Sequence, residues 1–338
     1  MASRSKFLPQ PALIIFSTLF SALLAGSARA QSALDVANIT PRVESALVAT
    51  SLNPAIRKSV DMVLVPVSVT DEMERLVVGL GPGNFVVLDD KHRQQIKHFS
   101  TDDAPVSVGV IVDMSGSMRD KLDRVQEAVR QFCRASNLQD EFFLITFSDQ
   151  PHLLTDFTNS DNIEQELLFA HPSGRTALLD AIYMGLGRMR EAKYARKVLL
   201  IISDGGDNHS RYSEKELKAT VKESDVMIYA IGTFDRFVPT EEERLGPWLL
   251  SDITGVTGGR AFVLDDAREM PALAHRVGTE LRLQYVLGYD PPELPHNGKW
   301  HRISVKLILP KHLPFLRVHA RTGYYAANSG PPVATLSR

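Results

Sequence analysis

Three oxygen-bearing side chains follow a continuous apolar run in the first half of the chain. The stretch VGVIVDMSGSM, residues 108–118, contains Asp113, Ser115 and Ser117 at alternate positions. Alternate residues of an extended loop can direct their side chains the same way, and Gly116 permits a tight turn between them. Oxygen atoms gathered in this way are the ligands that hard divalent cations prefer. The spacing indicates that a cation lies among them.

A second carboxylate and a third hydroxyl occur in two later loops. The apolar run VLLIISD, residues 198–204, ends in Asp204, and the loop HPSGRTALLDA, residues 171–181, brings Thr176 to the start of a helix. In an open parallel sheet the carboxyl ends of the strands share one edge, so Asp113 and Asp204 should emerge there together. Two neighbouring carboxylates repel each other, and burial adds to the cost. A divalent cation relieves that repulsion.

The predicted ligands are Asp113, Ser115, Ser117, Thr176 and Asp204. Two carboxylates, three hydroxyls and water suit Mg²⁺, which requires octahedral geometry and keeps several waters, although Mn²⁺ and Ca²⁺ also take oxygen. Because only the two aspartates carry charge, the ion would stay partly positive and keep an exchangeable position for an outside carboxylate. A helix N-terminus near Met118 adds to the attraction for an anion.

The elements that must position these residues alternate between strands and helices. Continuous apolar runs predict strands covered on both faces at residues 106–112, 142–147, 197–203, 226–232 and 259–264. Apolar residues at helical spacing predict helices over residues 118–132, 177–189 and 270–281, and a more polar helix is expected over 213–223. The alternation predicts an α/β fold with a doubly wound, mostly parallel sheet over residues 104–283.

Both flanks of this α/β segment read as β structure. Valines alternate through DMVLVPVSVTD, residues 61–71, and apolar residues alternate again through residues 303–309 and 316–320. Neither flank has enough strands for a stable core of its own. We therefore predict that residues 59–103 and 284–326 pair with each other in a small β-sandwich-like module, into which the α/β domain is inserted.

The N-terminus has the pattern of an export signal. Arg4 and Lys6 precede the apolar stretch PALIIFSTLFSALLAG, and ARA follows, which predicts a signal peptide over residues 1–30 with cleavage after Ala30. An uncleaved anchor is the alternative, but the run is shorter than the ~20 residues that span a bilayer. Residues 31–58 are expected to form a linker and residues 327–338 a tail. The mature protein is expected to be secreted or periplasmic, without a stable membrane span.

Composition excludes several classes of protein. The 338 residues are 44% hydrophobic and 23% charged, which is typical of a globular protein. A formal net charge of -2, without a basic patch interleaved with aromatic residues, argues against nucleic acid as a partner. Cys133 is the single cysteine, which excludes an internal disulfide and a cysteine-ligated zinc site. It lies on an apolar helical stripe, where an inert buried thiol is expected.

The five predicted ligands also match a known motif. Asp113, Ser115 and Ser117, the Thr176 of GRTALLDA and the Asp204 of IISDGGDN resemble the metal-ion-dependent adhesion site (MIDAS) of von Willebrand factor type A (VWA) domains. The flanking segments VPVSVTD, NFVVLDD, QYVLGYDPP and RTGYYA extend the resemblance to secreted bacterial VWFA-related proteins, best known from Acidobacteria. Such domains usually bind proteins and are not enzymes. The resemblance implies an adhesion or assembly module whose metal coordinates an Asp or Glu carboxylate of a protein partner.

Enzyme signatures are incomplete in this chain. Aspartyl phosphatases of the haloacid dehalogenase type need a second Asp two residues after the first, as general acid, and Ser115 stands there. A serine-hydrolase elbow needs Gly-x-Ser-x-Gly, but Asp113 occupies the first glycine position. A metal-dependent hydrolase is therefore the least favoured alternative. The other is a structural or assembly module whose metal site is not essential.

Overall fold

The computed structural model describes residues 62–168, 171–204, 206–234, 241–291, 298–309 and 315–326, without the side chains of 241–243. The predicted signal peptide, the linker over 31–58 and the tail over 327–338 lie outside the described residues. Within the described ranges, none of the helices is both long and apolar enough to cross a bilayer.

A six-stranded sheet forms the centre of the α/β domain. Its strand order is β10-β9-β8-β5-β6-β7. The strands are β5 (Val106–Asp113), β6 (Glu141–Phe147), β7 (Pro151–Thr158), β8 (Arg196–Ser203), β9 (Val226–Thr233) and β10 (Ala261–Leu264). All neighbouring pairs are parallel except β6 with β7, which is antiparallel. Strand β5 is central and its eight residues are buried, as expected of a strand covered on both faces.

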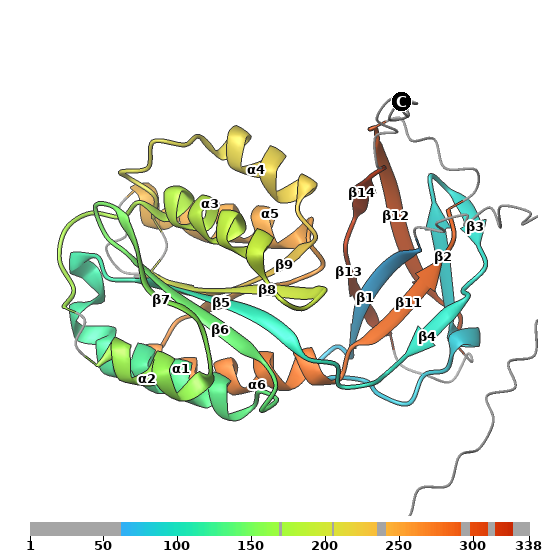
Figure 1. The fold of residues 1–338 in the computed structure, drawn as a ribbon, viewed down its shortest axis with the longest axis horizontal. Helices are drawn as coiled ribbons and strands as arrows, with labels where there is room; N and C mark the ends of the chain where they lie inside the picture. Colours follow the sequence, from blue (N-terminus) through green and yellow to red (C-terminus); the bar gives the residue numbers. More distant parts are fainter. Residues whose placement is uncertain are drawn as a thin grey trace, which may run out of the picture. The chain divides into compact units, whose positions relative to one another are not determined.

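Helices cover both faces of this sheet (Figure 1). Helices α1 (Leu122–Arg134), α2 (Ser160–Leu167) and α6 (Met270–Arg282) lie on one side, and α3 (Leu178–Arg188), α4 (Glu214–Glu223) and α5 (Glu241–Gly255) lie on the other. Successive β5 residues serve different cores: Val110 and Val112 pack in the cluster that contains α1 and α6, and Ile111 packs in the cluster that contains α3. The predicted doubly wound α/β fold is confirmed.

The flanking strands pair with each other across the length of the chain. One sheet has the order β13-β1-β11-β4 and the other β14-β12-β2-β3. The N-terminal flank supplies β1 (Val63–Thr70), β2 (Phe85–Asp89), β3 (His92–Gln94) and β4 (His98–Ser100), and the C-terminal flank supplies β11 (Tyr285–Tyr289), β12 (Trp300–Leu307), β13 (Arg317–Ala320) and β14 (Gly323–Tyr325).

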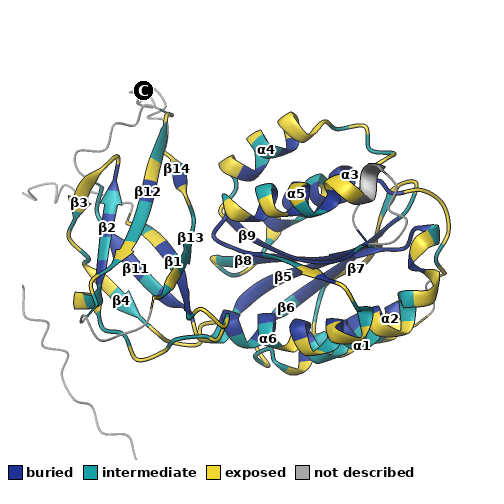
Figure 2. Ribbon diagram, turned by 180° about the vertical axis from the view of Figure 1, so that it is seen from behind, coloured by how far each residue is buried: buried dark blue, intermediate teal, exposed yellow. Residues whose placement is uncertain are grey.

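Both of these sheets mix strands from the two flanks. Strand β1 lies antiparallel to β11 and β13, and β2 lies antiparallel to β12. Their buried faces share one core that includes Val67, Val87 and Tyr289, and Figure 2 shows the buried residues on these strands. The predicted sandwich-like module, built from both flanks around an inserted α/β domain, is confirmed as an architecture.

Some elements of the α/β domain differ from the sequence expectation. Strand β7 and helix α2 were not predicted, and the helix expected from Met118 begins as a 3₁₀ turn over Gly116–Lys121 before α1 starts at Leu122. Strand β7 is an edge strand whose residues are exposed or half-buried, so it has no continuous apolar run to signal it. Its antiparallel pairing with β6 closes one side of the sheet.

Candidate functional site

Asp113 is the last residue of the central strand and is completely buried. Its Oδ1 accepts a hydrogen bond from the Ser115 backbone N–H at 2.8 Å, and its Oδ2 accepts one from the Ser203 hydroxyl at 2.6 Å. Burial, and secondarily the charge of Asp204, raise the pKa of Asp113 to about 6. The carboxylate is thus fixed in orientation and carries its charge at an energetic cost.

Ser115 and Ser117 lie together in the loop after Asp113. Their hydroxyl oxygens are 3.1 Å apart, so the alternate spacing does bring them side by side. Ser115 is buried and Ser117 is exposed, which places this pair between the interior and solvent. The 3₁₀ turn that follows is anchored by Met118, which is fully buried.

Thr176 reaches the same edge because its loop is joined to the Asp113 loop. The Gly116 N–H donates to the Gly174 carbonyl at 3.1 Å, and the Ser173 N–H donates to the Met114 carbonyl at 2.8 Å. Gly174 has a φ of +85°, and a Cβ there would lie 2.6 Å from a carboxylate oxygen of Asp149, so the tight loop requires glycine. Thr176 itself is buried.

Asp204 follows the end of β8, the strand next to β5, and its side chain is 4% exposed. Its Oδ2 accepts a hydrogen bond from the Lys121 ammonium at 2.8 Å. The structure therefore supplies Asp204 with a cation from the chain itself. Lys121 was not among the predicted site residues. The sequence offered one signal, because the helix predicted from Met118 would place Lys121 in its first turn, where the helix dipole disfavours a cation.

The loop after Asp204 is joined to Thr176. Asn208 accepts a hydrogen bond from the Thr176 N–H through its side chain at 3.0 Å and donates one to the Thr176 carbonyl at 3.0 Å. Asp180 accepts hydrogen bonds from the N–H groups of Arg211 at 2.9 Å and Tyr212 at 3.1 Å. Asn208 and Asp180 thus join the Thr176 segment to the loop after Asp204. Together with the backbone bonds of the Asp113 loop, these contacts bring the three loops to one edge of the sheet.

The donor set fits a hard divalent cation. Two buried carboxylates lie close enough for the charge of one to raise the pKa of the other. The Ser115 hydroxyl lies beside Asp113 and 3.1 Å from the Ser117 hydroxyl. The Lys121 ammonium contacts Asp204. Oxygen donors with a net negative charge bind Mg²⁺, Mn²⁺ or Ca²⁺. The assignment of these five residues as ligands, and the identity of the metal, remain predictions.

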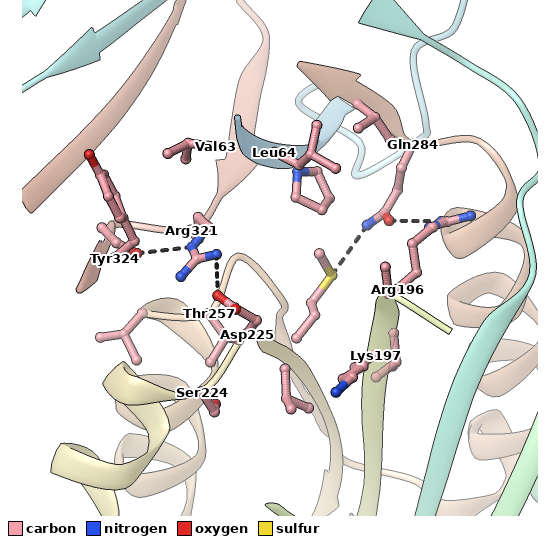
Figure 3. A pocket seen from close by; sticks show the side chains of 18 of the residues that line it. Val63, Leu64, Arg196, Lys197, Ser224, Asp225, Thr257, Gln284, Arg321 and Tyr324 are labelled. Atoms are coloured by element: carbon pink, nitrogen blue, oxygen red, sulfur yellow. Dashed lines mark hydrogen bonds and ion pairs between the residues drawn. The ribbon is translucent and has the colours of Figure 1, made fainter. Parts of the chain in front are cut away.

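A cavity of about 600 Å³ lies away from these residues, where the β1 and β14 strands meet the starts of β8 and β9. Figure 3 shows it between Val63 and Leu64 on one side and Lys197 and Ser224 on the other. The predicted ligands do not line it. The candidate site is therefore a set of joined loops and not this cavity.

Comparisons with known proteins identify the α/β domain. A profile of the von Willebrand factor type A domain matches residues 108–206, a range that contains all five predicted ligands. The chain contains a VWA domain, as the motif resemblance implied. Comparison with curated proteins finds no match.

Solved structures with similar folds include several bacterial proteins. PilB minor pilin from Streptococcus sanguinis is 14% identical with a TM-score of 0.44, covering 54% of this chain and 62% of the pilin. A von Willebrand factor type A protein from Catenulispora acidiphila is 13% identical with a TM-score of 0.46, covering 76% and 73%. BatB from Bacteroides thetaiotaomicron is 15% identical with a TM-score of 0.42, covering 52% and 98%. At these values the similarities support no functional conclusion.

Proposed function

Because residues 108–206 match a von Willebrand factor type A domain, we propose that the protein is an exported, metal-dependent protein-binding module for adhesion or assembly. Asp113, Ser115, Ser117, Thr176 and Asp204 would hold a divalent cation, Mg²⁺ in first place and Mn²⁺ or Ca²⁺ as alternatives. When bound, the cation supplies a coordination position for an Asp or Glu carboxylate of a protein partner. Export rests on the predicted signal peptide, with a secreted or periplasmic location.

The observation that carries the proposal is the state of Asp113. Its carboxylate is buried at the end of the central strand, beside a second buried carboxylate, and its pKa is raised to about 6. Carboxylates with strongly shifted pKa values cluster at functional sites, where the charge is needed for binding or catalysis. Two carboxylates with neighbouring hydroxyls are well suited to coordinate a divalent cation.

Binding fits these residues better than catalysis. Both oxygens of Asp113 already accept short hydrogen bonds, from the Ser115 N–H and the Ser203 hydroxyl, so the carboxylate is held as a fixed acceptor. Ser115 and Ser117 hydrogen-bond each other, and a serine nucleophile needs an adjacent base to remove its proton. The roles that the site offers are to orient and to coordinate.

Substitution of Asp113 tests the proposal. In Asp113→Ala we expect the loss of both the thermal stabilisation by Mg²⁺ and the Mg²⁺-dependent capture of a partner from the native envelope. Asp120→Ala is the matched control, since Asp120 is an exposed acid in the turn that follows. Capture that survives both chelation and Asp113→Ala would reject the metal-dependent mechanism.

A second candidate function has one specific observation in its favour. Lys121 gives Asp204 a cation without any metal, which would allow the fold to serve as a structural or assembly module with a non-essential site. In that case calorimetry with Mg²⁺ would record no binding heat, and chelation would leave the assembly intact. A screen of phosphatase and esterase substrates, with and without metal, separates both candidates from a metal-dependent hydrolase.

A further inference from the structure

A second group of potential metal ligands lies in the β-sandwich module. Asp89 ends strand β2, Asp90 belongs to the turn between β2 and β3, and His301 lies near the start of β12. Strands β2 and β12 are antiparallel neighbours, with Asp89 opposite Ile303, so His301 lies beside the turn. Each of the three side chains offers a ligand atom, and these atoms all lie within 4.8 Å of one another.

The buried carboxylate of Asp89 is only half satisfied. Its side chain is 5% exposed. Its Oδ2 accepts hydrogen bonds from the hydroxyls of Tyr289 and Tyr324, each at 3.0 Å. Its Oδ1 has no hydrogen-bond partner among the described residues, and lies 3.9 Å from His301 Nδ1. A buried carboxylate oxygen without a partner is costly, and a cation bound at this atom would reduce that cost.

Asp90 and His301 form the solvent-accessible side of this group. Asp90 Oδ2 lies 2.9 Å from His301 Nδ1, and Asp90 Oδ1 accepts the Arg302 N–H at 2.9 Å. The Asp90 side chain is 49% exposed, which leaves a path for an ion from solvent. The His301 ring stacks on Tyr324 with centroids 5.4 Å apart, so its orientation is fixed by packing. His301 Nε2 is buried without a hydrogen-bond partner among the described residues. With the imidazole proton on Nε2, the lone pair of Nδ1 can act as a ligand.

We propose that Asp89, Asp90 and His301 bind one divalent transition-metal ion, with Zn²⁺ as the best match. One imidazole and two carboxylates suit Zn²⁺, and water fills a fourth position in its tetrahedral coordination. The hydroxyls of Tyr289 and Tyr324 orient the Asp89 carboxylate from behind, as outer hydrogen bonds commonly do for ligating carboxylates. The bound ion would fasten the β2–β3 turn of the N-terminal flank to β12 of the C-terminal flank.

This site is independent of the proposed VWA metal site. It belongs to the other module, it contains an imidazole nitrogen, and its residues lie outside the range 108–206 that the VWA profile matches. Mg²⁺ avoids nitrogen ligands, whereas Zn²⁺ accepts them readily. The two sites should therefore be distinguishable by metal and by variant.

Isothermal titration of the full chain with Zn²⁺, in excess Mg²⁺ to occupy the VWA site, tests the proposal. We expect one Zn²⁺ per chain, bound at least tenfold more weakly by Asp90→Asn and by His301→Gln. His98→Gln is the control, because His98 is an exposed histidine on strand β4. Asp90→Asn changes an exposed turn residue, so it keeps the test valid if His301→Gln fails to fold. Co²⁺ provides a second readout through the visible absorption bands of its four-coordinate complexes.

The outcomes separate the possibilities. Zn²⁺ binding that is weakened by Asp90→Asn and His301→Gln, but unaffected by Asp113→Ala, supports the second site even if the proposed function of the VWA site proves wrong. The proposal is overturned by the absence of Zn²⁺ binding in the wild type, by equal binding in Asp90→Asn, or by binding that only Asp113→Ala removes.

Discussion

At the scale of single residues, the burial of two carboxylates sets the electrostatic cost of the proposed VWA metal site. Asp113 ends the central strand and is fully buried, and Asp204 directly follows the neighbouring strand with 4% of its side chain exposed. The hydrogen bonds from Ser203 and Ser115 lower the pKa of Asp113, but burial and the charge of Asp204 outweigh them. The metal-free site is therefore under electrostatic strain that a cation would release.

We predict that Asp113→Asn stabilises the metal-free protein at neutral pH and abolishes its stabilisation by Mg²⁺. The folded-state pKa of Asp113 is raised from 3.8 to about 6, so the stability that its neutral form provides is present below pH 3.8 and is lost as the pH rises through 6. Asparagine stays neutral, and the gain at pH 7.5 is at most about 3 kcal/mol.

Thermal unfolding of wild type and Asp113→Asn in chelator, from pH 4 to pH 8, checks this. The two curves should converge at the acid end and separate above pH 6. If the unfolding midpoints of wild type and Asp113→Asn differ by the same amount at pH 4 and at pH 8, the charge of Asp113 does not destabilise the metal-free protein.

Lys121 offers a second prediction at this scale. Its ammonium lies 2.8 Å from Asp204 Oδ2, so a metal ion and this ammonium compete for the same carboxylate. Lys121→Gln should raise the affinity for Mg²⁺ by roughly tenfold, because a hydrogen bond to a charged group contributes about 1.5–3 kcal/mol. Calorimetric titration measures the change, with Lys215→Gln on the exposed side of α4 as the control. Equal or weaker Mg²⁺ binding by Lys121→Gln would exclude competition.

At the scale of elements, close helix packing holds the first turn of α1 against the sheet. Helices α1 and α6 lie on the same face, and Val125, Phe132 and Val277 share its core. Cys133 of α1 lies in the same core, where burial raises the pKa of its thiol to about 12, as expected of an inert thiol. The loop that carries Ser115 and Ser117 leads directly into α1, so the packing of α1 positions the site.

At Gly278 the two helices approach each other closely. A Cβ at Gly278 would lie 2.7 Å from the Ala135 Cβ and 3.1 Å from the Phe132 carbonyl oxygen. Gly278→Ala should therefore destabilise the protein by about 1–3 kcal/mol through overpacking.

Gly187 is the matched control for this substitution, since it also lies within a helix but a Cβ there meets nothing within 4 Å. Gly187→Ala should be neutral or stabilising by up to about 1 kcal/mol. Urea unfolding of both variants measures the difference, and an unchanged midpoint in Gly278→Ala would show that the two helices can separate without cost.

At the scale of the whole molecule, ion pairs connect the VWA domain to the β-sandwich module. Arg260, just before β10, pairs with Glu280 of α6 at 3.1 Å and with Glu74 in the connection between β1 and β2. Glu74 also pairs with Arg317 of β13 at 2.6 Å. Glu280 is 1% exposed and has Arg260 as its counter-ion, so this contact is buried and directional.

Arg260→Ala should strongly destabilise the folded protein. It leaves the charge of Glu280 buried without a counter-ion, a change that typically costs about 3–5 kcal/mol. Arg268→Ala is the control, because Arg268 is 77% exposed and its pair with Asp266 is a surface pair worth about 0–1 kcal/mol. Chemical unfolding of both variants measures these effects, and similar midpoints for the two would show that Glu280 does not depend on Arg260.

The sequence by itself determined the five parallel strands of the α/β domain, most of its helices and the edge of the sheet at which the predicted ligands gather. Continuous apolar runs mark strands buried on both faces, and the carboxyl ends of parallel strands share one edge. Asp113 and Asp204 could therefore be placed together before any contact was known. Strand β7 was not predicted, because an exposed edge strand lacks the continuous apolar run of a buried strand.

Only the tertiary structure decided which charges meet. The pairing of Lys121 with Asp204 depends on how the 3₁₀ turn before α1 lies beside the residue that follows β8. The approach of Asp90 to His301 joins residues 211 positions apart through the register of β2 with β12. Hydrophobic periodicity records which face of an element is buried, but it carries no information on which polar side chains become neighbours. That information arises from strand pairing and packing over the whole chain.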